Sequence, residues 1–199
     1  MIATAARERN EIEAVVCESA ESKAAGTVVP VLADVTRAGD CEKVVDAAVT
    51  RFGRLDILVN NAGPGMKYVS DSFLTEPTRF WEISPETWRL IVDTNVNGPF
   101  FMARCAAPLM IRARWGRIIN ISVSRETMRR RGFSPYGPSK AALESETIIW
   151  SQSWPVPESQ SMRFFLADRL APEWFRMVSR MRSGRGCSIP RLWCRRFSG

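Results

Sequence analysis

The sequence predicts an α/β fold built around a parallel sheet. Short apolar runs alternate with amphipathic helical patterns along the first 150 or so residues. Strand–helix repetition of this kind places parallel strands side by side, with helices covering the faces of the sheet. The length of 199 residues suits one domain.

Three strands and two helices are predicted in the first sixty residues. The apolar runs Ile2–Ala6, Val28–Leu32 and Leu55–Asn60 are the predicted strands. Apolar residues at helical spacing predict helices over Glu8–Ala25 and Asp40–Phe52. A glycine follows each helix and readily adopts the backbone conformation that ends one.

The second half of the pattern begins with a loop over Pro64–Ile83. Ser84-Pro85-Glu86 then combines a helix N-cap, a proline suited to the first helical turn and an early acid. Beyond this point we predict helices through Asn95, over Ala103–Met110 and over Pro135–Gln152, and a strand over Gly116–Ser122.

The composition excludes several kinds of catalytic site. The sequence has no histidine, which removes Ser-His-Asp triads, Cys-His pairs and histidine-ligated metals together. The cysteines form no C-x-x-C motif, so we expect reduced thiols and no metal site. They are Cys17, Cys41, Cys105, Cys187 and Cys194.

The net charge of +7 belongs mainly to the end of the chain. From Ser151 onward there are nine arginines, no lysine and three acids, whereas the preceding residues carry 19 basic and 18 acidic groups. We therefore expect neither a nucleic-acid-binding face nor a membrane contact. The start of the sequence lacks the apolar core of a signal peptide, and a cytoplasmic location is expected.

Tyr136 and Lys140 are the most informative pair of side chains. Four residues apart on a predicted helix, they share one face. A tyrosine has an ordinary pKa of about 10, and a neighbouring ammonium lowers it by favouring the phenolate. Such a phenol can exchange a proton with a substrate oxygen near neutral pH.

Five motifs, taken in order, resemble those of the short-chain dehydrogenase/reductase family. They are Asp34-Val35, Asn60-Asn61-Ala62-Gly63, Asn95-Val96-Asn97-Gly98, Gly116-Arg117-Ile118-Ile119-Asn120-Ile121-Ser122 and Tyr136-x-x-x-Lys140. The resemblance implies a Rossmann-like, doubly wound parallel sheet over residues 1–152. It also implies a nicotinamide dinucleotide at the carboxyl ends of the strands.

The resemblance implies catalytic roles for three residues. Tyr136 would be the general acid/base, and Lys140 would hold the nicotinamide ribose and lower the Tyr136 pKa. Asn95 would anchor a water molecule of a proton relay. The alternatives are an ordinary helix-start tyrosine and a polar residue that merely distorts its helix.

The resemblance also implies residues that bind the cofactor. The turn Asn61-Ala62-Gly63 would let the cofactor pass close to the backbone, where a residue larger than glycine would collide. Asp34, next to Val35, would lie beside the adenine ring or, alternatively, cap the following turn. Arg7 follows Ala6 where an acid would select NAD(H), so NADP(H) is preferred through its 2′-phosphate. A solvated surface arginine is the alternative.

The catalytic serine has two candidates. The family usually places it thirteen residues before the tyrosine, and that position is Val123 here. Ser122 and Ser124 flank it. A loop shortened by one residue would bring Ser124 into the site, and we prefer this assignment. On an unbroken strand, alternation would point both serines away.

The start of the sequence departs from the family pattern. The family opens with a strand and a T-G-x-x-x-G-x-G turn whose N–H groups hold the pyrophosphate, and this sequence has no such turn. It begins about where the family's second strand begins. We expect unpaired ladders on the strands ending at Ala6 and at Asn60, and weak or absent cofactor binding.

Residues 153–199 depart as well. They read as an irregular tail rich in Arg, Trp and Pro, where the family has a strand and a Pro-Gly turn. Codons for Ser153 through Leu166, read one base out of register, can spell L-A-G-T-G-V-T-V-N-A-L-L-P, which is close to that pattern. Our hypothesis is a frameshift from about Ser153.

The predicted function is hydride transfer between NADP(H) and a small alcohol or carbonyl substrate, impaired in this chain. Aromatic and apolar residues in the loop favour an apolar or ring-shaped substrate, unless they only pin the loop. They are Met66, Tyr68, Phe73, Phe80 and Trp81. The alternative function is that of a non-catalytic family member acting through homo-oligomerisation, with the Tyr136 helix and the helix before Gly116 packed against a partner's copies.

Overall fold

The computed structural model describes residues 1–6, 9–21, 26–153 and 162–168. The strands are β1 (Ile2–Ala5), β2 (Val29–Leu32), β3 (Ile57–Asn60), β4 (Gly116–Ser122) and β5 (Met162–Asp168). The helices are α1 (Arg9–Glu21), α2 (Ala38–Phe52), α3 (Pro85–Val92), α4 (Gly98–Arg112), α5 (Arg125–Met128) and α6 (Tyr136–Gln152). A π-helical turn, η3 (Asp93–Asn97), joins α3 to α4, and two 3-10 turns, η1 (Met66–Tyr68) and η2 (Phe80–Glu82), lie in the preceding loop.

The predicted α/β class is confirmed, and the helix boundaries have the predicted local causes. All paired strands are parallel. Gly53 ends α2 with φ of 70°, a conformation that glycine adopts without strain. Ser84 caps α3, because its Oγ accepts a hydrogen bond of 3.1 Å from the backbone N–H of Thr87.

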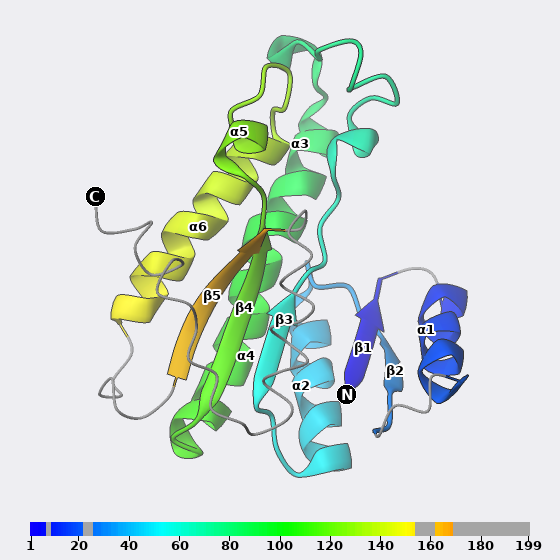
Figure 1. Cartoon of the computed structure of the whole chain (residues 1–199), viewed down its shortest axis with the longest axis vertical. Coiled ribbons are helices and arrows are strands. Elements are labelled where there is room, and N and C mark those ends of the chain that lie inside the picture. The colour runs from blue at the N-terminus through cyan, green and yellow to red at the C-terminus, as the bar shows by residue number, and fades with distance from the viewer. Residues whose placement is uncertain (7–8, 22–25, 154–161, 169–199) are drawn as a thin grey trace.

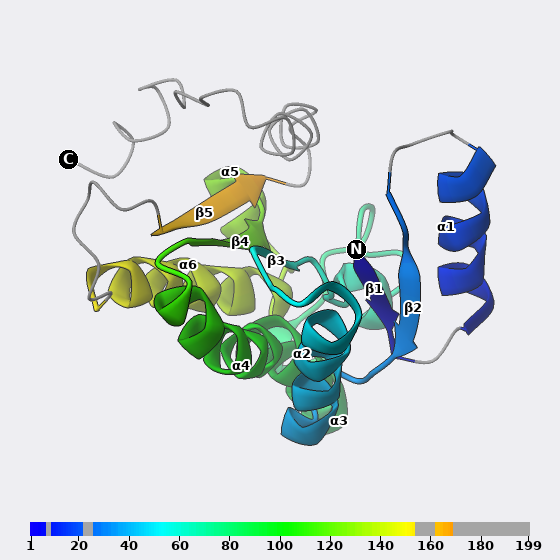
Figure 2. The ribbon, with the colours of Figure 1, turned by 90° about the horizontal axis from the view of Figure 1, so that it is seen from below.

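The strands form two separate sheets, β1-β2 and β3-β4-β5 (Figure 1). Ile2 lies opposite Val29 in the first sheet, and Ile57 lies opposite Arg117 in the second. Among the described residues, no ladder joins β1 to β3, although the two strands are neighbours in both ribbon views (Figures 1 and 2). The break falls where the sequence predicts two unpaired ladders.

A shared apolar core joins the two sheets. Helices α2 and α4 pack together, and Ile2 and Val31 of the first sheet lie against the same core. Its buried members are Ala33, Cys41, Val44, Val45, Leu58, Met102, Ala103, Ala106, Met110 and Ile118. Helices α2, α4 and α6 lie on one side of β3-β4-β5 (Figure 2). Apolar burial therefore connects the sheets where strand pairing does not.

Met162–Asp168, which lies within the predicted irregular tail, is a strand in the structure. This segment forms β5 and pairs in parallel with β4 along its full length, with Gly116 opposite Met162. Two physical reasons favour a strand here. The free edge of β4 offers unpaired N–H and C=O groups, and Phe164-Phe165-Leu166 is an apolar run typical of a parallel strand. The proposed frameshift falls largely on residues 154–161 and 169–199, outside the described residues.

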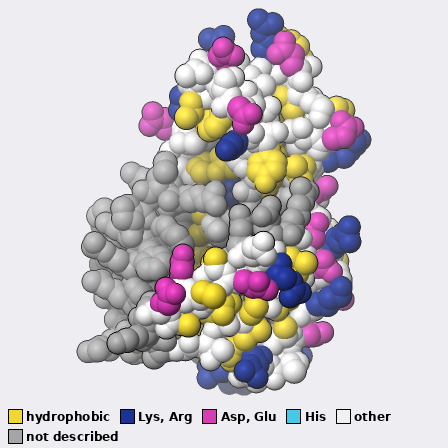
Figure 3. Space-filling view, turned by 90° about the vertical axis from the view of Figure 1, so that its right-hand side faces the viewer, with side chains coloured by type: hydrophobic (Ala, Val, Ile, Leu, Met, Phe, Trp, Pro, Cys, Tyr) yellow, Lys and Arg dark blue, Asp and Glu magenta, His cyan; other side chains and the backbone are white. Residues whose placement is uncertain are grey.

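The described surface carries charges of both signs. On the face shown in Figure 3, basic and acidic side chains are interspersed over the described residues. None of the helices in the described part of the chain is both long enough and apolar enough to span a bilayer. Cys17, Cys41 and Cys105 are free thiols, and Cys187 and Cys194 lie outside the described residues.

The thiol of Cys41 provides a test of this packing. It is 1% exposed, its Sγ donates to the Val35 carbonyl at 3.4 Å, and burial raises its pKa to about 11. We expect iodoacetamide at mildly alkaline pH to alkylate the exposed Cys17 and to spare Cys41 until the protein is unfolded in guanidinium. Peptide mass spectrometry measures both. Equal labelling of the two thiols in native buffer would contradict the packing.

Candidate active site

Tyr136 and Lys140 lie together at the carboxyl end of β4. Both belong to the first turns of α6, and they are 8% and 5% exposed. The Lys140 Nζ donates a hydrogen bond of 2.7 Å to the backbone carbonyl of Ile121, the next-to-last residue of β4. It also lies 6.0 Å from the centre of the Tyr136 ring. The predicted proximity of phenol and ammonium is present in the structure.

The Tyr136 ring is packed in a small apolar cluster of its own. Its buried partners are Met66, Val123 and Phe133. Met66 comes from the loop after β3, Val123 directly follows β4, and Phe133 precedes α6. Three separate segments thus hold the ring, so its orientation is fixed by packing on several sides.

Asn95 reaches the pair from the π-helical turn η3. Its side chain is fully buried, and its Nδ2 donates to Ser139 Oγ at 2.9 Å and to the Pro64 carbonyl at 3.4 Å. Ser139 Oγ in turn donates to the Tyr136 carbonyl at 2.7 Å. Asn95 does lie in a distorted helix, as the alternative predicts, and the distortion brings its amide to α6. Single π turns of this kind are frequent at functional sites.

Gly63 brings the turn after β3 to the same point. A Cβ at this position would lie 2.6 Å from Asn95 Oδ1 and 3.6 Å from Lys140 Nζ. The first distance is a collision, so the residue must be glycine for Asn95 to keep its place. The sequence analysis predicts that glycine is needed here because a larger residue would collide with the cofactor. The structure shows that a larger residue would also collide with Asn95. Asn61 and Ala62 are exposed beside this point.

One polar atom in this group has no hydrogen-bond partner among the described residues. Asn95 Oδ1 is buried, and no hydrogen bond to it is formed. A buried amide oxygen in this state costs about 1–3 kcal/mol relative to a satisfied one. An acceptor oxygen kept open beside a lysine can receive a water or a ligand hydroxyl. The described residues contain no cluster of acids or thiols that could hold a metal ion.

The two serine candidates do not make hydrogen bonds to this group. Ser122 Oγ donates to Glu144 Oε1 at 2.9 Å. Ser124 caps α5, because its Oγ accepts from the Thr127 N–H at 3.2 Å and lies 3.0 Å from Thr127 Oγ1. Val123 faces Tyr136 between them. Strand alternation therefore continues past the end of β4, which favours position 123, rather than Ser124, as the one that faces the tyrosine.

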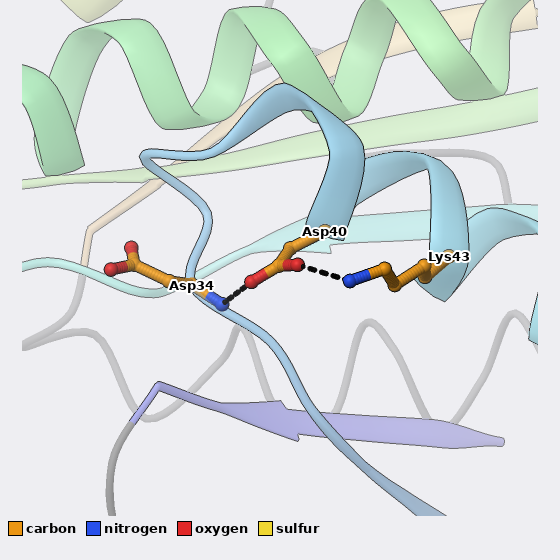
Figure 4. Close-up of polar contacts among 3 residues, drawn as sticks. All are labelled: Asp34, Asp40 and Lys43. Atoms are coloured by element: carbon orange, nitrogen blue, oxygen red, sulfur yellow. Dashed lines mark hydrogen bonds and ion pairs between the residues drawn. The ribbon is translucent and has the colours of Figure 1, made fainter.

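Asp34 caps the turn between β2 and α2. Its Oδ1 accepts hydrogen bonds from the Thr36 N–H at 3.0 Å and from Thr36 Oγ1 at 2.7 Å. Its own N–H donates to Asp40, which also binds Lys43, and the Asp34 carboxylate points away from both (Figure 4). The Lys43 hydrogen bond is the main cause that lowers the pKa of Asp40. Asp34 therefore caps the following turn, as the alternative prediction states, and its contact with the adenine ring stays a prediction.

Of the two remaining predicted cofactor residues, the structure describes Val35 but not Arg7. Val35 lies where α2 and α4 approach, and a Cβ on Gly98 would lie 2.9 Å from its Cγ2. Val35 therefore sets how closely the start of α4 approaches the end of β2. Arg7 lies outside the described residues, and its contact with a 2′-phosphate stays a prediction.

The aromatic loop divides into two groups. Met66 belongs to the Tyr136 cluster and Phe73 packs against it, so these two line the side of the site. Tyr68, Phe80 and Trp81 are exposed, with the rings of Phe80 and Trp81 edge-to-face at 5.0 Å. Only the first group therefore fits the predicted role in enclosing a substrate.

A buried polar chain below the site was not predicted. Asn60 Nδ2 donates to Asn120 Oδ1 at 2.8 Å, and Asn120 Nδ2 donates to Thr147 Oγ1 at 2.8 Å. Thr147 Oγ1 donates to the Leu143 carbonyl in α6. This chain links β3, β4 and α6. The signal was available, because Asn60 ends one apolar strand and Asn120 interrupts another, and a buried amide must find a partner.

Fold and site together define a Rossmann-like α/β protein with a tyrosine–lysine pair at the carboxyl ends of its strands. The family model described as short chain dehydrogenase matches residues 1–154. The chain belongs to this family.

Known relatives are longer than this chain. It is 41% identical over 143 residues to 11-beta-hydroxysteroid dehydrogenase A of Sesamum indicum, covering 72% of this chain and 38% of the relative. It is 33% identical over 120 residues to sorbitol-6-phosphate 2-dehydrogenase of Klebsiella pneumoniae, covering 60% and 44%. The chain thus spans about two fifths of the length of these relatives.

Solved structures share the fold. A metagenomic short-chain oxidoreductase in complex with NADP aligns with a TM-score of 0.71 at 23% identity, covering 86% of this chain and 71% of that one. A short-chain dehydrogenase from Streptomyces avermitilis aligns with a TM-score of 0.67 at 25% identity, covering 84% and 54%. These likenesses support the predicted doubly wound architecture.

Replacing Gly63 tests the geometry of the site without requiring activity. Gly63→Ala drives a methyl group into Asn95 Oδ1, so we expect a loss of about 1–3 kcal/mol in the free energy of unfolding. Gly65→Ala is the matched control, because nothing lies within 4 Å of its Cβ. It should be neutral or stabilise by up to about 1 kcal/mol. Urea unfolding measures both, and equal stabilities would show that Gly63 does not face Asn95.

Proposed function

We propose that this chain acts as an oxidoreductase that transfers a hydride between a nicotinamide dinucleotide and an alcohol or carbonyl compound. One observation carries the proposal: Tyr136, Lys140, Asn95 and Gly63 converge at the carboxyl ends of β3 and β4. Three segments distant in sequence contribute to this point: the turn after β3, η3 and the start of α6. Packing alone does not require a buried ammonium, an open amide oxygen and a phenol to meet there.

Tyr136 is the proposed general acid/base. Its ring is held by the cluster around Met66 and Phe133, so its hydroxyl keeps one direction while a substrate enters. In reduction the phenol gives its proton to the carbonyl oxygen of the substrate, and in oxidation the phenolate takes the proton of the alcohol. Lys140 favours the phenolate through its charge.

The site fits the nicotinamide end of a dinucleotide. Lys140 and Asn61–Gly63 would hold the ribose and the adjoining part of the cofactor, and Asn95 Oδ1 is an open acceptor for a relay water. When bound, the cofactor donates a hydride to the substrate carbon or accepts one from it. The chain's own part is to orient the two reactants and move the proton.

NADP(H) is the proposed cofactor, with NAD(H) as the alternative. The preference depends on Arg7, which follows β1 next to Ala6, the position where an acid would select NAD(H). The adenine contact of Asp34 is part of the same proposal. Because the sequence contains no glycine-rich turn of the T-G-x-x-x-G-x-G kind, weak cofactor binding also stays a prediction.

A second candidate function is association without catalysis. Ile148 and Ile149 are exposed on α6, and Phe100 on α4 is exposed beside Trp150, with ring centres 6.3 Å apart. An apolar strip shared by two helices favours contact with a second copy. A dimer in sedimentation, combined with no turnover in the assay below, would favour this function over the first.

Tyr136→Phe is the direct test of the proposed chemistry. It removes the hydroxyl but keeps the ring, so we expect kcat for NADPH-dependent ketone reduction to fall about 10²–10⁴-fold without loss of stability. Tyr68→Phe is the matched control, because that side chain is 60% exposed and is the only other tyrosine. NADPH absorbance follows the reaction. Equal loss in both variants, or in neither, would rule out Tyr136 as the acid.

Position 123 tests which residue supplies a hydroxyl. Val123→Ser places an Oγ where the side chain already packs beside Tyr136, so we expect kcat to rise about tenfold. Ser124→Ala removes the α5 cap and should cost about 1 kcal/mol of stability with little change in kcat. The same assay and thermal unfolding measure these effects. If Ser124→Ala loses turnover and Val123→Ser gains none, Ser124 is the residue that supplies the catalytic hydroxyl.

A further inference from the structure

An arginine-lined hollow opens next to the proposed site. It is an open depression with a volume of about 700 Å³, and it is formed by the segment that follows β4. We call it the arginine hollow. Its described lining residues are Ser124, Arg125, Glu126, Thr127, Arg129 and Arg130. Three guanidinium groups and one carboxylate give this small region a positive charge.

The hollow adjoins the first turn of α6. A Cβ on Gly137 would collide with the Met128 carbonyl, so the end of α5 touches the residue next to Tyr136. The Met128 side chain packs against the cluster that holds the Tyr136 ring. Helix α5 lies beside the upper end of α6 in Figure 1. The segment that lines the hollow therefore contacts both the first turn of α6 and the cluster that holds the Tyr136 ring.

Two of the three guanidinium groups of the hollow, those of Arg129 and Arg130, form no ion pair within the described residues. The Arg130 guanidinium lies over the Phe133 ring at 5.2 Å, and Phe133 belongs to the Tyr136 cluster. This stacking holds one cation in place. Ser124 caps α5 and so fixes the backbone from which the arginines project.

We propose that the arginine hollow binds an anionic group, a phosphate or a carboxylate, carried by the alcohol or ketone substrate. Adjacent guanidinium groups match the paired oxygens of such anions. The substrate, rather than the cofactor's 2′-phosphate, is the source, because the residues predicted to contact the adenine end of the cofactor, Arg7 and Asp34, follow β1 and β2 whereas the hollow follows β4. This inference rests on the proposed function for the identity of its ligand.

Binding of inorganic phosphate tests the hollow without requiring turnover. Calorimetry at low ionic strength should detect phosphate binding to the 199-residue chain, and Arg129→Gln/Arg130→Gln should weaken it at least about tenfold. Arg129→Lys/Arg130→Lys keeps the charge and should keep most of the affinity. Arg104→Gln/Arg112→Gln removes the same charge from exposed positions of α4 and should change nothing. Equal affinities in wild type and Arg129→Gln/Arg130→Gln would overturn the proposal.

Matched ketones then identify what carries the anion. Levulinate is paired with its methyl ester, and dihydroxyacetone phosphate with dihydroxyacetone, so each pair differs in charge at one end. We expect wild type to prefer at least one anionic member, and that ratio of kcat/KM to fall about tenfold in Arg129→Gln/Arg130→Gln. A preference that survives the substitution overturns the proposal. So does a variant that loses discrimination between NADP⁺ and NAD⁺, since the bound anion would then be the cofactor's.

The two proposals fail in different ways. If phosphate binding depends on Arg129 and Arg130 but no ketone is reduced, the hollow stands as an anion site and the proposed oxidoreductase function fails. If both members of each pair are reduced at ratios that the substitution leaves unchanged, the oxidoreductase function stands and the anion site fails.

Discussion

A buried ammonium organises the end of the molecule where the candidate site lies. Moving a lysine charge out of water costs several kcal/mol unless polar groups surround it. Lys140 is 5% exposed, and its Nζ is held by the Ile121 carbonyl at 2.7 Å. That contact ties α6 to the end of β4. Because Tyr136 lies one turn earlier on the same helix, the contact that satisfies the lysine also positions the phenol.

The site also depends on a core that spans two unpaired sheets. β1-β2 and β3-β4-β5 share no ladder among the described residues, yet α2 and α4 pack side chains from both sheets into one cluster. The close approach of Gly98 to Val35 links the end of β2 to the start of α4. The turn η3, which carries Asn95, directly precedes α4. The position of Asn95 is therefore coupled to the packing of the first sheet as well as to α6.

Much of this arrangement is predictable from the sequence because it follows from short-range periodicity. Apolar runs and helical spacing locate the strands up to Ser122 and the helices up to Gln152 apart from α5, and the i, i+4 spacing places Tyr136 and Lys140 on one face. The π turn at Asn95 is not predictable in this way, since tertiary contacts with Ser139 and Pro64 stabilise it. Pairing of β5 with β4 depends on a free strand edge and is likewise non-local.

Several departures from ordinary packing rules meet at the candidate site. An ammonium is buried, the Asn95 amide oxygen is left open, a helix widens into a π turn, and Gly63 leaves no room for a methyl group. Each departure costs stability when considered alone. Selection for stability alone would favour substitutions that remove these departures. Their meeting at the carboxyl ends of two parallel strands is what a site built for chemistry requires, and it supports the proposal that Tyr136 acts on a substrate.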